Sequence, residues 1–153
     1  MKIRPVILCG GAGTRLWPDK KKHQAKQFID FGGWSLIQKT LERTNKPIFD
    51  FPIISTNLKY LKQVKQALKK SKIKKFKIVL EPAKKNTAPA ILASALIKDI
   101  PFEQPLMFFA ADHLIEKSNI LNKSLLKNKS NLDNQNLFIF GIKPTNPSSE
   151  YGY

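Results

Sequence analysis

Short apolar runs separated by longer amphipathic stretches make up most of this 153-residue chain. The first run, residues 3–9, is rich in β-branched side chains and ends at glycines, which is typical of a buried strand. Similar short runs recur along the chain. The pattern predicts five strands, at residues 3–9, from 52–55 onward, at 76–80, at 106–110 and at 137–142.

The stretches between these runs carry apolar residues at helical spacing, with lysines on the outer faces. In one of them Thr87 is placed to cap a helix, and Pro89 falls in the first turn, where proline is tolerated. The pattern predicts helices over residues 34–46, 58–68 and 87 to about 99, and a helical or irregular stretch over 116–131.

Strands and helices that alternate at this rhythm predict an α/β fold with a mostly parallel sheet, in a three-layer α/β/α, Rossmann-like arrangement. The length suits one compact domain and is too short for two. Ligands of such sheets bind beyond the carboxyl ends of the strands. Polar residues that directly follow a predicted strand are therefore the first candidates for a functional site.

The formal net charge of +16 comes from 27 basic residues, of which 24 are lysines. Proteins that read nucleic-acid bases use more arginine, because its planar fork matches guanine edges and phosphates. We interpret the lysines as a solvated surface whose field also attracts polyanionic small substrates. We expect no nucleic-acid partner, with nucleic-acid binding as the minor alternative.

No apolar run approaches the ~20 residues that span a bilayer. The run before the glycines is also shorter than the ~7–15 residues of a signal-peptide core. We therefore expect a cytoplasmic protein without a membrane partner. The single cysteine, Cys9, lies within the first apolar run, which indicates a small buried strand residue and leaves no internal disulfide.

The first predicted strand leads into a glycine-rich segment, Gly10-Gly11-Ala12-Gly13-Thr14-Arg15. Glycines allow the backbone to turn sharply and bring its N–H groups close to an anion. Arg15 follows at once and can hold phosphate oxygens through paired hydrogen bonds. The spacing fits neither a Walker loop nor the dinucleotide fingerprint. Shortly afterwards Lys26 offers a second cation for phosphates.

Two further polar clusters follow predicted strands. Glu81 precedes Asn86 and Thr87, whose amide, hydroxyl and backbone N–H groups suit a base edge or a ribose, or simply cap a helix. Asp112 follows an apolar strand, where an acid needs a partner. A hard cation such as Mg²⁺ is a natural partner for a carboxylate near phosphates.

Together these segments resemble the sugar-1-phosphate nucleotidyltransferases, and specifically the mannose-1-phosphate guanylyltransferases. The family pattern contains Gly-Gly-x-Gly-x-Arg-Leu-x-Pro, Pro-Lys-Gln-Phe, Glu-Pro-x-x-x-Asn-Thr-Ala-Pro-Ala, Ala-Asp-His, Phe-Gly-Ile-x-Pro-Thr and Tyr-Gly-Tyr. The matching segments occur here in the same order, at residues 10–18, 25–28, 81–90, 111–113, 140–145 and 151–153. The Glu-Pro…Asn-Thr-Ala-Pro segment together with Ala-Asp-His favours the guanylyl branch.

The resemblance implies a set of roles. The nucleotide would be bound by Gly10, Gly11, Gly13, Thr14, Arg15, Glu81, Asn86 and Thr87. The catalytic residues would be Arg15, Lys26 and Asp112, with Asp112 also holding Mg²⁺. Gly141 and Gly152 would line the sugar pocket. The implied reaction forms GDP-mannose and pyrophosphate from GTP and mannose-1-phosphate.

The chain departs from the family pattern at two places. Asp19-Lys20-Lys21 stands where the family has Ser-Arg, and Ala25 replaces the proline before Lys-Gln-Phe. Family members also continue well past residue 153, so we expect residues 1–153 to be the N-terminal, nucleotide-binding part of a truncated nucleotidyltransferase domain, without its sugar-binding remainder. The alternatives are a sibling transferase for another base or sugar and a non-catalytic nucleotide-binding module. The oligomeric state stays open, a homodimer included.

Overall fold

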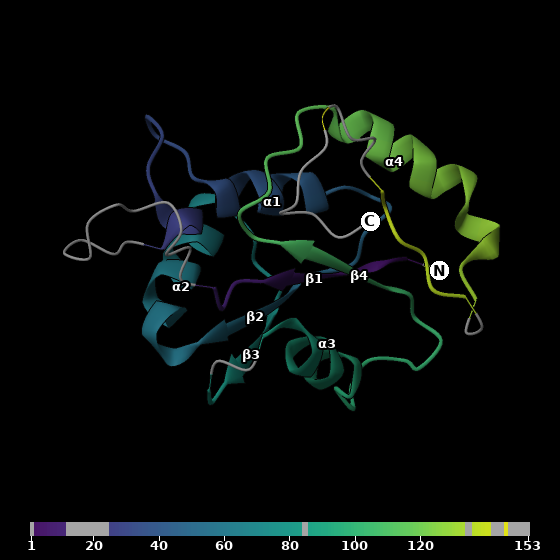
Figure 1. Ribbon diagram of the computed structural model, residues 1–153, viewed down its shortest axis with the longest axis horizontal. Helices are drawn as coiled ribbons and strands as arrows, with labels where there is room; N and C mark the ends of the chain where they lie inside the picture. The colour runs from purple at the N-terminus through teal and green to yellow at the C-terminus, as the bar shows by residue number, and fades with distance from the viewer. Residues whose placement is uncertain (1, 12–24, 84–85, 134–135, 142–145, 147–153) are drawn as a thin grey trace.

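The computed structural model of the protein describes residues 2–11, 25–83, 86–133, 136–141 and 146. Within these residues four strands form one sheet in the order β3-β2-β1-β4, and every neighbouring pair is parallel (Figure 1). The strands are β1 (Arg4–Leu8), β2 (Ile53–Asn57), β3 (Lys77–Glu81) and β4 (Leu106–Ala110). The parallel sheet of the predicted α/β fold is confirmed.

Helices cover both faces of this sheet. They are α1 (Leu36–Thr44), α2 (Leu61–Lys70), α3 (Thr87–Ala95) and α4 (Ser118–Lys127), with short 3₁₀ turns at Lys26–Phe28, Leu58–Tyr60 and Lys129–Asn131. The chain steps in one direction from β1 through β2 to β3, and it then returns across the sheet to β4. Because such crossovers are right-handed, α1 and α2 share one face and α3 lies on the other (Figure 1). The result is the three-layer arrangement that the sequence predicts.

The core is concentrated around the two central strands. β1 and β2 are buried along almost their whole length, while β3 and β4 are half-buried. On one face, the apolar stripes of α1 and α2 bury Ile37, Leu41, Val64 and Leu68 completely or almost completely. Burying each such side chain contributes about 1.5–3 kcal/mol. A rigid central pair of strands therefore holds the ends from which the site residues extend.

Two local predictions are wrong. Residues 137–141 do not form a strand, and their large side chains lie exposed, with Leu137 at 89%. An apolar run becomes a strand only where it finds a hydrogen-bonding edge, and no partner pairs with it in the described part of the chain. Residue 142 lies outside the described residues. At α3 the N-cap is Asn86 and not Thr87, which is the first helical residue, whereas Pro89 lies in the first turn as expected.

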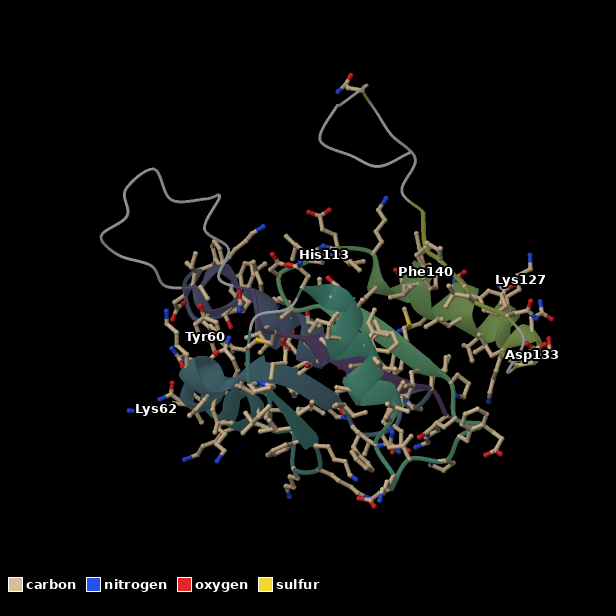
Figure 2. All side chains as sticks on the ribbon, turned by 60° about the horizontal axis from the view of Figure 1, so that its bottom comes forward. Tyr60, Lys62, His113, Lys127, Asp133 and Phe140 are labelled. Atoms are coloured by element: carbon tan, nitrogen blue, oxygen red, sulfur yellow. The ribbon has the colours of Figure 1, made fainter. Side chains whose placement is uncertain are left out.

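Lysines on two helices are solvated, as the sequence predicts. Lys62 on α2 and Lys127 on α4 extend outward into solvent (Figure 2). No helix among the described residues is both long and apolar enough to cross a membrane.

Candidate nucleotide-binding site

The order of the strands creates a switch point between β1 and β4. The chain leaves β1 toward β2 on one side, whereas β4, which follows β3 in the sequence, lies on the other side of β1. Crevices at such points bind the ligands of open α/β sheets. The glycine-rich segment follows β1 and Asp112 follows β4, and the Ala111 N–H donates to the Leu8 carbonyl (3.1 Å) across the gap. The fold thus brings two of the predicted clusters together.

Three consecutive carbonyls of the glycine-rich turn are held by side chains from elsewhere in the chain. Thr56 Oγ1 donates to Cys9 O (3.2 Å), Asn57 Nδ2 to Gly10 O (3.2 Å) and Gln27 Nε2 to Gly11 O (2.9 Å). We call these three donors the carbonyl clamp. In a trans peptide the N–H points opposite to the C=O. The clamp therefore turns the N–H groups of Gly10 and Gly11 away from itself and fixes the turn before any ligand arrives.

Glu81, at the end of β3, lies against this turn. Its Oε1 accepts a hydrogen bond from Ser55 Oγ (2.8 Å). A Cβ added at Gly10 would lie 3.0 Å from Glu81 Oε1 and 3.1 Å from Oε2, closer than side chains normally pack. Glycine at position 10 therefore allows the carboxylate to approach the backbone. Asn57 Oδ1 is buried nearby without a hydrogen-bond partner among the described residues.

Lys26 and Asp112 meet on the other side of the turn. Lys26 begins the 3₁₀ turn Lys26–Phe28, and its Nζ lies 3.9 Å from Asp112 Oδ2. Both side chains are about one-third exposed, so phosphates can reach them. The described residues contain no cluster of three or more acidic, histidine or cysteine side chains that would enclose a metal. A single carboxylate suits Mg²⁺, which keeps waters and takes its other ligands from phosphates.

A buried arginine supports the segment after β4. Arg43 of α1 donates through Nη2 to Thr40 Oγ1 (2.7 Å) and to the backbone carbonyl of His113 (3.2 Å). Burial lowers the pKa of its guanidinium from the ordinary value. The imidazole of His113 is exposed (Figure 2). Arg43 thereby fixes the backbone directly after Asp112.

The start of α3 presents Asn86 and Thr87 to solvent. Asn86 has φ 62° and ψ −159° and makes no capping hydrogen bond with its side chain. This backbone region is essentially restricted to glycine, and a residue held there costs about 1–3 kcal/mol. Its side chain thus stays available at the carboxyl edge of the sheet, near the end of β3.

Of the remaining predicted site residues, the structure describes only some. Gly13, Thr14, Arg15 and Gly152 lie outside the described residues. Gly141 is exposed, and a Cβ added there would have no heavy atom within 4 Å, so the structure does not bring it to the other site residues. Cys9 is buried as expected, and this burial raises the pKa of its thiol to about 12. A thiol in that state is not a nucleophile at neutral pH.

Several supporting residues were missed by the sequence reasoning. These are Gln27, Ser55, Thr56, Asn57 and Arg43. A signal existed for three of them, because the apolar strand β2 ends in Ser-Thr-Asn at the edge where ligands bind. Gln27 belongs to the Lys-Gln-Phe segment of the family pattern, which gave it no role, and its partner lies 16 residues away in sequence. Arg43 is recognisable only from its partner 70 residues away.

Residues 4–153 match the family described as Nucleotidyl transferase. The chain belongs to this family. It is 37% identical to a mannose-1-phosphate guanylyltransferase of Escherichia coli, over 97% of this chain and 33% of that protein. It is 34% identical to the xanthan biosynthesis protein XanB of Xanthomonas campestris, over 99% of this chain and 33% of that protein. This nucleotidyltransferase chain therefore spans about a third of the length of these curated relatives.

Solved structures show the same fold. A Helicobacter pylori protein described as a mannose-6-phosphate isomerase superposes with a TM-score of 0.65 and 28% identity, over 85% of this chain and 46% of that one. A UDP-glucose pyrophosphorylase superposes with a TM-score of 0.61 and 24% identity, over 86% of this chain and 54% of that one. The second likeness concerns the fold alone.

Proposed function

We propose that this chain carries the GTP-binding part of a mannose-1-phosphate guanylyltransferase, which forms GDP-mannose and pyrophosphate from GTP and mannose-1-phosphate. The main support is the glycine turn fixed by the carbonyl clamp, with the Glu81 carboxylate against Gly10. On this proposal residues 1–153 are the N-terminal part of the nucleotidyltransferase domain. Names of relatives at 33–37% identity support the choice of guanine and mannose.

Glu81 is the group that we propose selects guanine. A carboxylate only accepts hydrogen bonds. The Watson–Crick edge of guanine presents two adjacent donors, the ring N–H and the exocyclic amine, whereas adenine presents no such pair. Although Oε1 already accepts from Ser55, each carboxylate oxygen has a further lone pair. Asn86 and Thr87, exposed nearby, would contact the base or ribose.

In the proposed reaction a phosphate oxygen of mannose-1-phosphate attacks the α-phosphorus of GTP. A new O–Pα bond forms, the bond from Pα to the bridging oxygen of the β-phosphate breaks, and the electron pair leaves with pyrophosphate. A phosphate monoester has a second pKa of about 6, so the nucleophile is already an anion at neutral pH. Catalysis then consists of positioning and charge neutralisation and needs no general base.

The residues of this chain would divide that work between them. The N–H groups of the glycine turn, with Gly13, Thr14 and Arg15, would bind the triphosphate. Lys26 would offset the repulsion between the two reacting anions. Asp112 would hold Mg²⁺, which supplies positive charge to the phosphates. Gly141 and Gly152 would contribute to the sugar pocket.

A nucleotide panel tests the choice of base. Thermal unfolding is measured with Mg²⁺ and each of GTP, ATP, CTP, UTP and dTTP. A ligand at about 100 times its Kd stabilises the fold by about 2.7 kcal/mol. We expect a shift with GTP alone. Equal shifts with ATP or dTTP would replace the guanylyl proposal by that of a sibling transferase.

Glu81→Gln sharpens the same test. This substitution keeps the size of the side chain but replaces one acceptor by a donor, so the preference for GTP over ATP should fall about tenfold or more. Glu42→Gln, at an exposed position on α1, is the matched control and should leave the preference unchanged. An unaltered preference in Glu81→Gln would remove guanine selection from Glu81.

Addition of mannose-1-phosphate then separates an enzyme from a binding module. Release of pyrophosphate, abolished by Asp112→Ala or Arg15→Ala without loss of the fold, supports the transferase. GTP binding without pyrophosphate release favours the non-catalytic alternative. The observation that motivates this alternative is that the chain spans about a third of the length of its relatives.

A further inference from the structure

A basic cavity lies at the amino edge of the sheet, opposite the nucleotide site. Its volume is about 340 Å³, and its wall includes Lys2, Phe51, Lys72, Lys74 and Lys75. These residues belong to the segments that directly precede β1, β2 and β3. Since the strands are parallel, their carboxyl ends, with the glycine turn and Glu81, lie at the other edge. The cavity is therefore separate from the proposed GTP site, and its size lies within the range of small-molecule pockets.

Asp50, the acidic residue that lines this cavity, does not neutralise the lysines of the wall. Asp50 lines the wall, but its carboxylate already accepts from Arg4 Nη2 (2.7 Å), Gln104 Nε2 (3.1 Å) and the Phe51 N–H (2.7 Å). Among the described residues no ion pair involves Lys72, Lys74 or Lys75. The wall thus holds three lysines whose counter-ions come from solution.

Lys72 has a backbone conformation that normally favours glycine. The Lys72 N–H donates to Lys69 O (3.1 Å) and the Ile73 N–H to Leu68 O (3.0 Å), which together form a Schellman motif at the end of α2. The residue at the position of Lys72 is usually glycine, because φ is positive, here 55°. A lysine in this conformation is less favourable than glycine. Its charge is nevertheless placed on the wall of the cavity.

Two cations lie against the ring of Phe51, which lines the cavity. The guanidinium of Arg4 lies 3.8 Å from the centre of the Phe51 ring, and Lys75 Nζ lies 4.5 Å from it. Both distances fall within the range of cation–π attraction. Arg4 is 4% exposed and also donates to the Phe51 carbonyl (3.0 Å). These contacts hold the Phe51 ring close to both cations.

We propose that this basic cavity binds a small molecule that carries two or more phosphate groups. Lysines from two segments line one volume, Lys2 before β1 and Lys72, Lys74 and Lys75 before β3. Multiple negative charges on one ligand would neutralise them together. Lysines near a helix C-terminus also stabilise the helix dipole. Lys69 and Lys70, in the last turn of α2, have that position without lining the cavity, whereas Lys74 and Lys75 lie beyond the helix. The two pairs therefore give a matched comparison.

The test is a titration of the whole chain with inorganic tripolyphosphate, followed residue by residue in ¹H–¹⁵N NMR spectra. A parallel titration uses a sugar bisphosphate, which distinguishes a linear polyphosphate from two separated phosphates. We expect saturable shifts at Lys72, Ile73, Lys74 and Lys75 with at least one of the two probes. Shifts confined to Gly10 and Gly11 would assign the anion to the carboxyl edge and overturn the proposal.

Variants separate binding from folding. Lys72→Gly should weaken binding about threefold, the effect of one exposed charge pair, while the melting temperature stays constant or rises. Adding Lys74→Gln and Lys75→Gln should bring the loss to about tenfold or more. The control Lys69→Gln with Lys70→Gln should retain full affinity. Equal losses in the control would show diffuse attraction by the lysine-rich surface and overturn the proposal, as would unchanged binding in the Lys72→Gly variant.

Discussion

The two edges of the sheet present positive charge to a ligand in different ways. At the carboxyl edge, Gln27, Thr56 and Asn57 of the carbonyl clamp donate to carbonyls of the glycine turn and so orient its N–H groups. At the amino edge, exposed lysines surround a cavity whose acid is already paired with Arg4. On our proposal, binding at the first edge would depend on the geometry set by nearly buried neutral groups as well as on the charges beside the turn. Binding at the second would depend on the number of charges, so substitutions at the two edges should have different consequences.

The largest effect is expected for Asp50→Asn at the amino edge. Arg4 is almost fully buried and would lose its carboxylate partner. A hydrogen bond to a charged group contributes about 1.5–3 kcal/mol, and partial exposure of Asp50 reduces this value. We expect a loss of about 2 kcal/mol in the free energy of unfolding, measured by urea denaturation.

Two comparisons test this assignment. Asp99→Asn removes the partner of Lys77 at a side chain that is 79% exposed, and it should leave stability unchanged within error. GTP affinity should be the same in both variants, because neither side chain lies at the carboxyl edge. A weaker GTP affinity in Asp50→Asn would show that the two edges are coupled.

The next effect is expected for Gln27→Ala in the carbonyl clamp. Loss of the donor to Gly11 O leaves this carbonyl without its partner and loosens the turn. GTP affinity, measured by calorimetry, should fall about tenfold, which corresponds to about 1.4 kcal/mol. Gln38→Ala removes a glutamine whose partner is Ser35 at the start of α1, and it should bind GTP normally. Equal affinity in the two variants would contradict the role of the clamp.

A smaller effect of opposite sign on stability is expected for Asn86→Gly. Glycine adopts the backbone conformation at this position without strain. Relief of that strain should raise the free energy of unfolding by about 1 kcal/mol. The loss of the amide should at the same time weaken GTP binding. If GTP affinity is retained in the stabilised variant, Asn86 acts only as the first residue of the turn into α3.

The smallest effect is on the pH dependence of stability. Burial raises the pKa of Asp50, but hydrogen bonds from Gln104 and Phe51 and the charges of Arg4 and Lys2 together hold this pKa below its ordinary value. Because the folded pKa is the lower one, the stabilisation is fully present above about pH 4. It is lost as the pH falls through the folded pKa. The free energy of unfolding of Asp50→Asn should fall less steeply with decreasing pH than that of the unsubstituted protein. Identical slopes would exclude this contribution of Asp50.

Much of the fold could be predicted because its signals are local. The apolar runs at 3–9 and 106–110 became β1 and β4, since buried parallel strands are hydrophobic on both faces. The glycines and Asp112 were recognised because each directly follows such a strand. Residues 137–141 carry the same signal without forming a strand, because strand formation also needs a partner edge.

The sequence by itself determined the alternation of strands and helices, the family motifs and the edge of the sheet at which they collect. Only the tertiary structure decided which side chains hold the glycine turn, that Arg43 reaches the backbone after Asp112, and that lysines from separate segments share one cavity. The physical reason is the distance along the sequence over which each interaction acts. Periodicity and turn chemistry act between neighbours, whereas the bond from Asn57 to Gly10 joins residues 47 apart and exists only once β1 and β2 are paired.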